Sequence, residues 1–172
     1  YDFGYVGVHE LVEKLENTFR TLTKLPGMRG HLFNWYDTKS LEPLRPQYIS
    51  TVDSGNLAGH LLTLKQACFE ISQKPFFNPK ARMGLADTLE IVLEQTLILK
   101  NANLVADTQG VNQLLVAVTS IRDSLDAKTW ATLVQELTEQ ADLLQPLERE
   151  NPQAPFQNVQ VWLNAALNQA RE

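Results

Sequence analysis

Apolar residues recur at helical spacing along most of the chain. Near the start they fall every three or four positions, with charged and polar residues between them: Leu11, Val12, Leu15, Phe19, Leu22 and Leu25. A period of about 3.6 residues places these side chains on one face of a helix. The pattern therefore predicts an amphipathic helix over residues 8–25, ended by Pro26 and Gly27.

The pattern changes between residues 28 and 55, where neither the helical nor the strand period is sustained. Aromatic residues, prolines and short polar residues dominate, and we expect a long ordered loop in which 33–36 and 47–52 are short extended pieces. Asp53 or Ser54 then suits the N-terminal cap of a second helix, which Pro75 ends.

Four further helical patterns fill the second half of the chain. They cover residues 81–99, 108–124, 126–147 and 158–170, with Asp126 as the expected cap of the third. We expect their apolar faces to pack in a core and their polar faces to be solvated, with Trp130 and Trp162 as isolated aromatics. Helices are the only long predicted elements, so we predict an all-α fold built of helical hairpins.

Length and charge narrow the classes of partner. The 172 residues carry a formal net charge of −5, so there is no basic excess to attract nucleic acid or an anionic membrane surface. No apolar stretch approaches the roughly 20 residues needed to span a bilayer, so direct membrane insertion is not expected. The single cysteine, Cys68, forms no internal disulfide. The opening at Tyr1, without a methionine, predicts a segment of a longer polypeptide.

The stretch from residue 30 to 59 holds most of the candidate chemistry. It places Trp35, Tyr36 and Tyr48 near short polar and acidic residues. Sugars present apolar C–H faces that stack on aromatic rings and hydroxyls that pair with carboxylates and amides, so this mixture suits a carbohydrate. The alternative is a buried connector whose aromatics fill gaps between helices and whose Asp and Ser residues cap them.

Asp37 and Asp53 are the carboxylates to consider for acid or base work, because two carboxylates flank the scissile bond in most glycoside-cleaving enzymes. Asp53 also suits a helix cap, and Asp37 suits ligand binding better than catalysis.

A metal site is not expected, because His9, His31 and His60 are scattered. No nucleotide motif is found and no cofactor is expected. Cys68 lies on the apolar side of its predicted helix, as a small core residue does.

Several blocks of sequence resemble the glucoamylase-like region of cyclic β-1,2-glucan synthases. They occur in the same order as in that family, within about the first two fifths of the chain: Tyr1–Gly7, Gly30–Thr38, Leu41–Leu44 and Tyr48–Leu61. The resemblance implies an (α/α)₆ toroid whose loops surround a sugar-binding cleft. It divides the chain into residues 1–74, the N-terminal part of this region, and residues 75–172, a helical segment of the same domain or an insertion in it.

In that family, one membrane-embedded polypeptide contains a glycosyltransferase, the glucoamylase-like region and a phosphorylase-like region. The glycosyltransferase extends the glucan from UDP-glucose. The glucoamylase-like region is associated with cyclisation by transglycosylation. The resemblance thus implies a cytoplasmic domain of an inner-membrane-associated bacterial protein, with β-1,2-glucan or a related oligosaccharide and the remaining domains of the parent polypeptide as partners.

The resemblance carries site residues over only within the matching blocks. The expected glucan contacts are Trp35, Tyr36, Asp37, Asp53 and Asn56. The catalytic acid and base are expected later in the region, so we expect no activity from this chain alone. A non-catalytic helical interaction or spacer module, whose loop merely locks two helices together, is the competing hypothesis.

Overall fold

The computed structural model describes the chain except for residues 75–77, 102–104, 106–107 and 153. Within the described residues the chain forms α-helices, one short 3₁₀ helix and one two-stranded hairpin, which confirms the all-α prediction. Two compact units are present: Val12–Phe76, and Tyr1–Leu11 together with Phe77–Glu172. The structure thus groups the first residues with the C-terminal helices, while the predicted domains, 1–74 and 75–172, stay a prediction.

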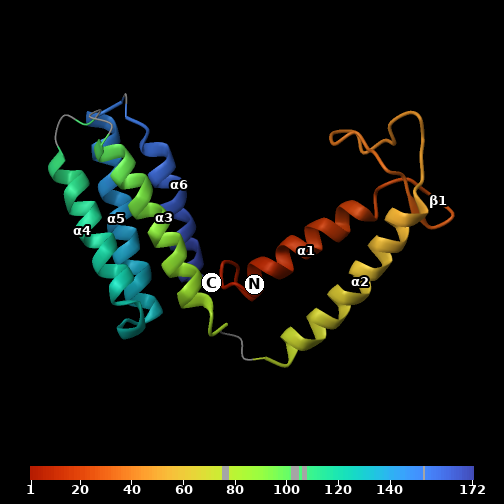
Figure 1. Ribbon diagram of the computed structural model, residues 1–172, viewed down its shortest axis with the longest axis horizontal. Coiled ribbons are helices and arrows are strands. Elements are labelled where there is room, and N and C mark those ends of the chain that lie inside the picture. The colour runs from red at the N-terminus through yellow and green to blue at the C-terminus, as the bar shows by residue number, and fades with distance from the viewer. Residues whose placement is uncertain (75–77, 102–104, 106–107, 153) are drawn as a thin grey trace. The chain divides into compact units, whose positions relative to one another are not determined.

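The larger unit is a four-helix bundle (Figure 1). Its helices are α3 (Ala81–Asn101), α4 (Thr108–Asp123), α5 (Trp130–Glu150) and α6 (Phe156–Arg171). Helix α3 packs against α4 and α6, and α5 packs against the same two, so the four helices enclose one core. The largest fully buried side chains of this core are Phe156, Leu85, Leu89, Leu99, Leu114, Leu133, Leu137, Leu144 and Leu163.

Two helix starts in the bundle differ from the sequence prediction. Leu125–Ala127 forms a 3₁₀ turn, so Asp126 does not cap α5. Thr129 takes that role, and its Oγ1 accepts a hydrogen bond from the Thr132 amide at 3.2 Å. Helix α6 starts two residues earlier than predicted, at Phe156, whose ring is buried in the core.

The first seven residues form a strap, Tyr1–Gly7, that lies on α3 and α6 of the same unit. A Cβ atom added to Gly84 of α3 would lie 2.4 Å from the carbonyl carbon of Gly4, so the two backbones touch where both residues are glycine. Gln169 Nε2 of α6 donates to the Tyr5 carbonyl at 3.2 Å. The Tyr5 hydroxyl donates to Asp87 Oδ2 at 2.9 Å, and this bond raises the pKa of Tyr5.

The smaller unit contains most of α1 (Val8–Leu22), α2 (Thr51–Ser72) and the loop between them. A short antiparallel hairpin opens the loop, with β1 (Gly27–Met28) paired to β2 (His31–Leu32). Its two turn residues, Arg29 and Gly30, have φ angles of 54° and 84°. Paired left-handed residues fit the right-handed twist of a two-residue hairpin turn.

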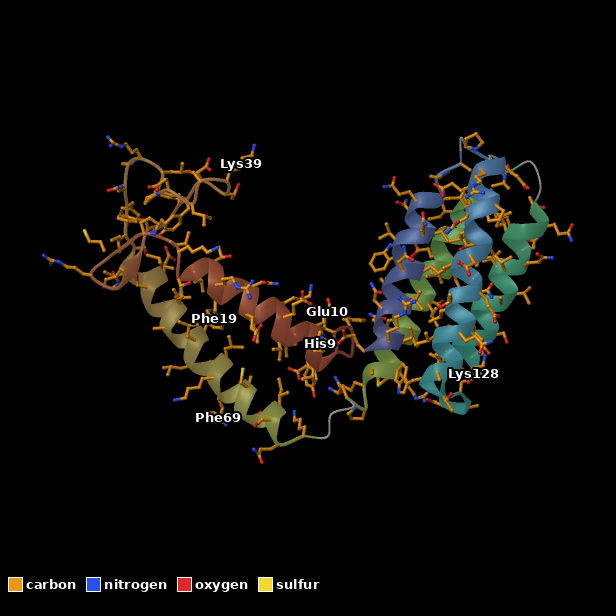
Figure 2. The ribbon with its side chains drawn as sticks, turned by 180° about the vertical axis from the view of Figure 1, so that it is seen from behind. His9, Glu10, Phe19, Lys39, Phe69 and Lys128 are labelled. Carbon is orange, nitrogen blue, oxygen red and sulfur yellow. The ribbon has the colours of Figure 1, made fainter. Side chains whose placement is uncertain are left out.

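This smaller unit has no buried residue in its described part. Val52 and Leu62 on α2 are 70% and 69% exposed, and Phe69 projects from the same helix (Figure 2). Cys68 is exposed too, so its assignment to the core is wrong for this structure. Helices with apolar residues on several sides are normally covered by other elements. None of the helices in the described ranges is long and apolar enough to cross a membrane.

Candidate functional site

Two aromatic rings stack on the surface of the long loop. The rings of Trp35 and Tyr48 have centroids 5.9 Å apart and an interplanar angle of 25°. The loop backbone holds them together, because the amide of Asn34 donates to the Tyr48 carbonyl at 2.9 Å and the amide of Leu44 donates to the Trp35 carbonyl at 3.0 Å. Trp35 is 51% exposed and Tyr48 is 53% exposed. We call this pair the aromatic platform.

Tyr36 holds the base of the loop. Its hydroxyl accepts a hydrogen bond from the Phe33 amide at 2.8 Å and donates one to the Pro26 carbonyl at 2.7 Å. The ring also meets the Phe33 ring edge-on, at a centroid distance of 6.4 Å. The hydroxyl of this half-buried residue is therefore used within the protein, where it ties the hairpin to the segment that carries Trp35.

Asp37 orders the next turn of the loop. Its Oδ1 accepts hydrogen bonds from the Ser40 amide at 2.7 Å and the Lys39 amide at 2.9 Å, and a further one from the Ser40 hydroxyl. The bond from the Ser40 amide is the largest cause that lowers the pKa of Asp37, followed by that from Lys39. The carboxylate is therefore ionised at neutral pH and supports the tip from which Lys39 projects (Figure 2).

The start of α2 is linked to the loop through Asn34. Ser50 is the N-terminal cap, and its Oγ accepts from the Asp53 amide at 3.1 Å, so the expectation that Asp53 or Ser54 caps this helix is wrong. Asn34 Oδ1 accepts from the Ser50 amide at 2.9 Å, and Asn34 Nδ2 donates to Asp53 Oδ2 at 2.8 Å. In an ordinary capping box the acidic side chain reaches back to the cap amide itself. Here the amide group of Asn34 bridges the two.

A cavity of about 700 Å³ opens beside this network. One wall is formed by residues 30–34, and the other is formed by residues of α2 between Thr51 and Leu61. The wall on α2 combines the polar groups of Asp53 and Ser54 with the apolar side chains of Leu57 and Leu61. Small-molecule sites are concave in this way, with a few polar groups among apolar ones.

The predicted site residues occupy different parts of this region. Trp35 belongs to the aromatic platform, Tyr36 and Asp37 hold the loop, and Asp53 lines the cavity. Asn56 lies exposed on α2 and is not among the cavity-lining residues.

Two residues that the sequence-based site omits are structurally central. Asn34 joins the loop to α2, and Tyr48 completes the aromatic platform. The sequence prediction overlooked the spacing Ser50-x-x-Asp53, a capping-box signature that would have placed the start of α2 correctly. In the part of the chain that the structure describes, no group of three or more His, Cys, Asp or Glu residues is arranged to hold a metal ion.

Comparison with known proteins gives one informative match. No protein-family model matches the chain. Over 93 residues the chain is 44% identical to the cyclic beta-(1,2)-glucan synthase NdvB of Rhizobium meliloti (strain 1021). This match covers 54% of the chain and 3% of that protein, so the chain spans a small part of its relative's length. The chain is therefore related in sequence to a segment of a cyclic β-(1,2)-glucan synthase.

Proposed function

We propose that the chain is part of a cyclic β-1,2-glucan synthase-like enzyme and that its loop between α1 and α2 binds the glucan. The observation that carries the proposal is the exposed aromatic platform in a chain 44% identical over 93 residues to a cyclic beta-(1,2)-glucan synthase. A stacked pair of half-exposed rings offers a flat apolar surface of the kind that the C–H face of a glucose ring covers.

The hydroxyl-pairing groups of this region and the hydrogen bonds that hold the loop agree with this ligand. A glucan is neutral, so its recognition requires hydroxyl-pairing groups rather than a basic pocket. Tyr36 and Asp37 contribute by holding the backbone on either side of Trp35, and Asp53 contributes a carboxylate at the neighbouring cavity. Asn56 remains a proposed contact for a longer glucan that follows α2.

The lack of buried residues around α1 and α2 supports a further part of the proposal. We place this unit as the first hairpin of a helical toroid, whose later hairpins cover the exposed side chains of α2, such as Val52 and Leu62. The acid and base of transglycosylation belong to those later hairpins. The isolated chain accordingly does not convert linear β-1,2-glucan, and measurable conversion by purified chain contradicts this part.

The binding proposal is tested by titrating the 172-residue chain with linear β-1,2-glucan in a calorimeter. Trp35→Ala should weaken binding about ten-fold or more, because the platform loses its larger ring. Trp162→Ala is the matched control, since Trp162 is also partly exposed, at 37%, but belongs to the bundle. It should leave the affinity unchanged.

A stability measurement separates this function from a spacer role. Emptying a buried aromatic site lowers the free energy of unfolding by about 3–5 kcal/mol. Trp35 is half-exposed, so we expect its replacement to lower that free energy by less than about 1 kcal/mol. A large loss of stability, together with no glucan binding by the unaltered chain, supports the helical spacer module instead.

A further inference from the structure

The start of α1 is hydrogen-bonded to a distant part of the chain. We infer that Glu172, which follows the last turn of α6, supplies the N-terminal cap of α1, so that the first turn of α1 depends on this end of α6 for its stability. A cap is a side chain that accepts from one of the first amides of a helix, which have no partner inside it. Helix α1 begins in the larger unit and continues into the smaller one, so this contact lets the bundle stabilise the helix that leads to the loop.

The sequence at the start of α1 provides no side-chain cap. The amide of Leu11 donates to the Gly7 carbonyl at 3.1 Å, which is the first hydrogen bond of the helix and makes Gly7 the cap position. Glycine has no side chain to accept from the amides that follow. By contrast, α2 and α5 begin at Ser50 and Thr129, whose hydroxyls accept from amides three positions ahead. The first amides of α1 therefore need an acceptor from elsewhere in the chain.

Glu172 provides that acceptor. Its Oε2 accepts a hydrogen bond from the amide of Glu10 at 3.1 Å, across 162 positions of sequence. Glu10 is the third residue of α1, and its amide is the one that a serine or aspartate at position 7 would reach. Oε1 of the same carboxylate lies 3.7 Å from His9 Nδ1, so both oxygens face the first turn of α1, where Figure 2 labels His9 and Glu10. The helix dipole also favours a negative group at this end of a helix.

Gly7 leaves the space that this carboxylate occupies. A Cβ atom added at Gly7 would lie 2.7 Å from both Cβ and Oε2 of Glu172, which is closer than real Cβ contacts. The Glu172 side chain therefore stands where the side chain of an ordinary cap would start. The missing local cap and the distant one thus belong to the same arrangement.

The fold of the bundle holds Glu172 at this position. The Glu172 amide donates to the Asn168 carbonyl at 3.2 Å and so continues the last turn of α6. Within that turn, Gln169 Nε2 donates to the Tyr5 carbonyl at 3.2 Å, and Ala170 is buried in the bundle core. The Glu172 side chain is only 23% exposed. Its carboxylate is available to α1 only while this end of α6 is docked against the strap.

The test is hydrogen exchange at the Glu10 amide of the 172-residue chain, measured by nuclear magnetic resonance. Glu172→Gly removes the acceptor, so exchange at Glu10 should become about five-fold faster, the size expected for the loss of one cap. Adding Gly7→Ser to this variant restores a cap within the helix, and exchange should return to its original rate. Gly7→Ala in the same background fills the same space without an acceptor, so exchange should stay fast.

Two controls separate the cap from general damage to the bundle. Glu150→Gly, at the end of α5, removes a glutamate from another helix end and should leave exchange at Glu10 unchanged. The amide of Leu163, whose side chain is buried in the bundle core, should stay equally protected in every variant.

Unchanged exchange at Glu10 in Glu172→Gly overturns the inference. The same rate with serine and with alanine at position 7 also overturns it, because the added acceptor then has no effect. Loss of protection at Leu163 together with Glu10 overturns it too, because the effect then lies in the packing of α6 rather than in the cap.

Discussion

We expect Gly84→Ala to lower the free energy of unfolding when the N-terminal strap is present and to raise it when the strap is removed. The added methyl group would lie 2.4 Å from both the carbonyl carbon and the carbonyl oxygen of Gly4. Because these are backbone atoms, no side-chain rotation relieves the overlap, and the strap must move away from α3. In the absence of the strap, the same methyl group meets no such obstacle.

The magnitude follows from two opposing contributions. Alanine in place of an interior helical glycine stabilises the folded state by about 1 kcal/mol. Displacing the strap from α3 breaks the bond that the Tyr5 hydroxyl donates to Asp87, as well as the bonds that Gln169 Nε2 and Asn78 Nδ2 donate to the carbonyls of Tyr5 and Tyr1. Each of the three is worth about 1 kcal/mol net. The full chain should therefore lose about 2 kcal/mol of stability, whereas a chain lacking residues 1–6 should gain about 1 kcal/mol from the same substitution.

The assay is urea unfolding followed by tryptophan fluorescence in a Trp35→Phe background. Trp130 and Trp162 then report on the bundle alone, because both lie on its helices. The four proteins, with and without the strap and with glycine or alanine at position 84, form a thermodynamic cycle. An effect of the same sign and size in both backgrounds refutes the reasoning, because the strap then does not press on Gly84.

Two further predictions concern the loop. Tyr36→Phe removes the hydroxyl that joins the Phe33 amide to the Pro26 carbonyl. Hydrogen exchange of the loop amides should therefore become faster, and the affinity for glucan should fall several-fold. An unchanged exchange rate contradicts this role of Tyr36. The pKa of Asp37 is lowered from its ordinary 3.8 in the folded chain, so its stabilisation of the turn is complete above that pH and is lost as the pH falls through the lowered pKa. Hydrogen exchange at the amides of Lys39 and Ser40 should show this acid step, and Asp37→Asn should lack it.

Much of the fold follows from the spacing of apolar residues. The helical pattern predicted at 8–25 is found as Val8–Leu22, and that predicted at 81–99 is found as Ala81–Asn101. The start of α2 was harder to predict, because four nearby residues are of types that cap helices: Ser50, Thr51, Asp53 and Ser54. The choice of Ser50 depends on the hydrogen bond that its amide makes to Asn34, sixteen positions earlier.

The candidate site was predictable only as a region. An aromatic and polar loop was expected to bind a sugar, and the loop does place Trp35 at the surface. Its partner ring, Tyr48, is thirteen positions further along the chain, and the backbone path between them includes Pro43 and Pro46. No local rule sets the distance between two rings across such a path. Of the cavity wall on α2, the predicted site included only Asp53, because the wall opposite it, residues 30–34, is distant in the chain.

The amino-acid sequence by itself determined the helices and the unusual loop, because helical hydrogen bonds join residues four positions apart and so leave a local pattern of apolar spacing. The tertiary structure decided which apolar faces are covered. Leu85 and Leu163 are buried in the bundle, while Leu62 and Phe69, which are equally apolar, remain exposed on α2. Burial depends on neighbours that are distant in the chain, and their arrangement in space is not encoded in any short stretch of residues.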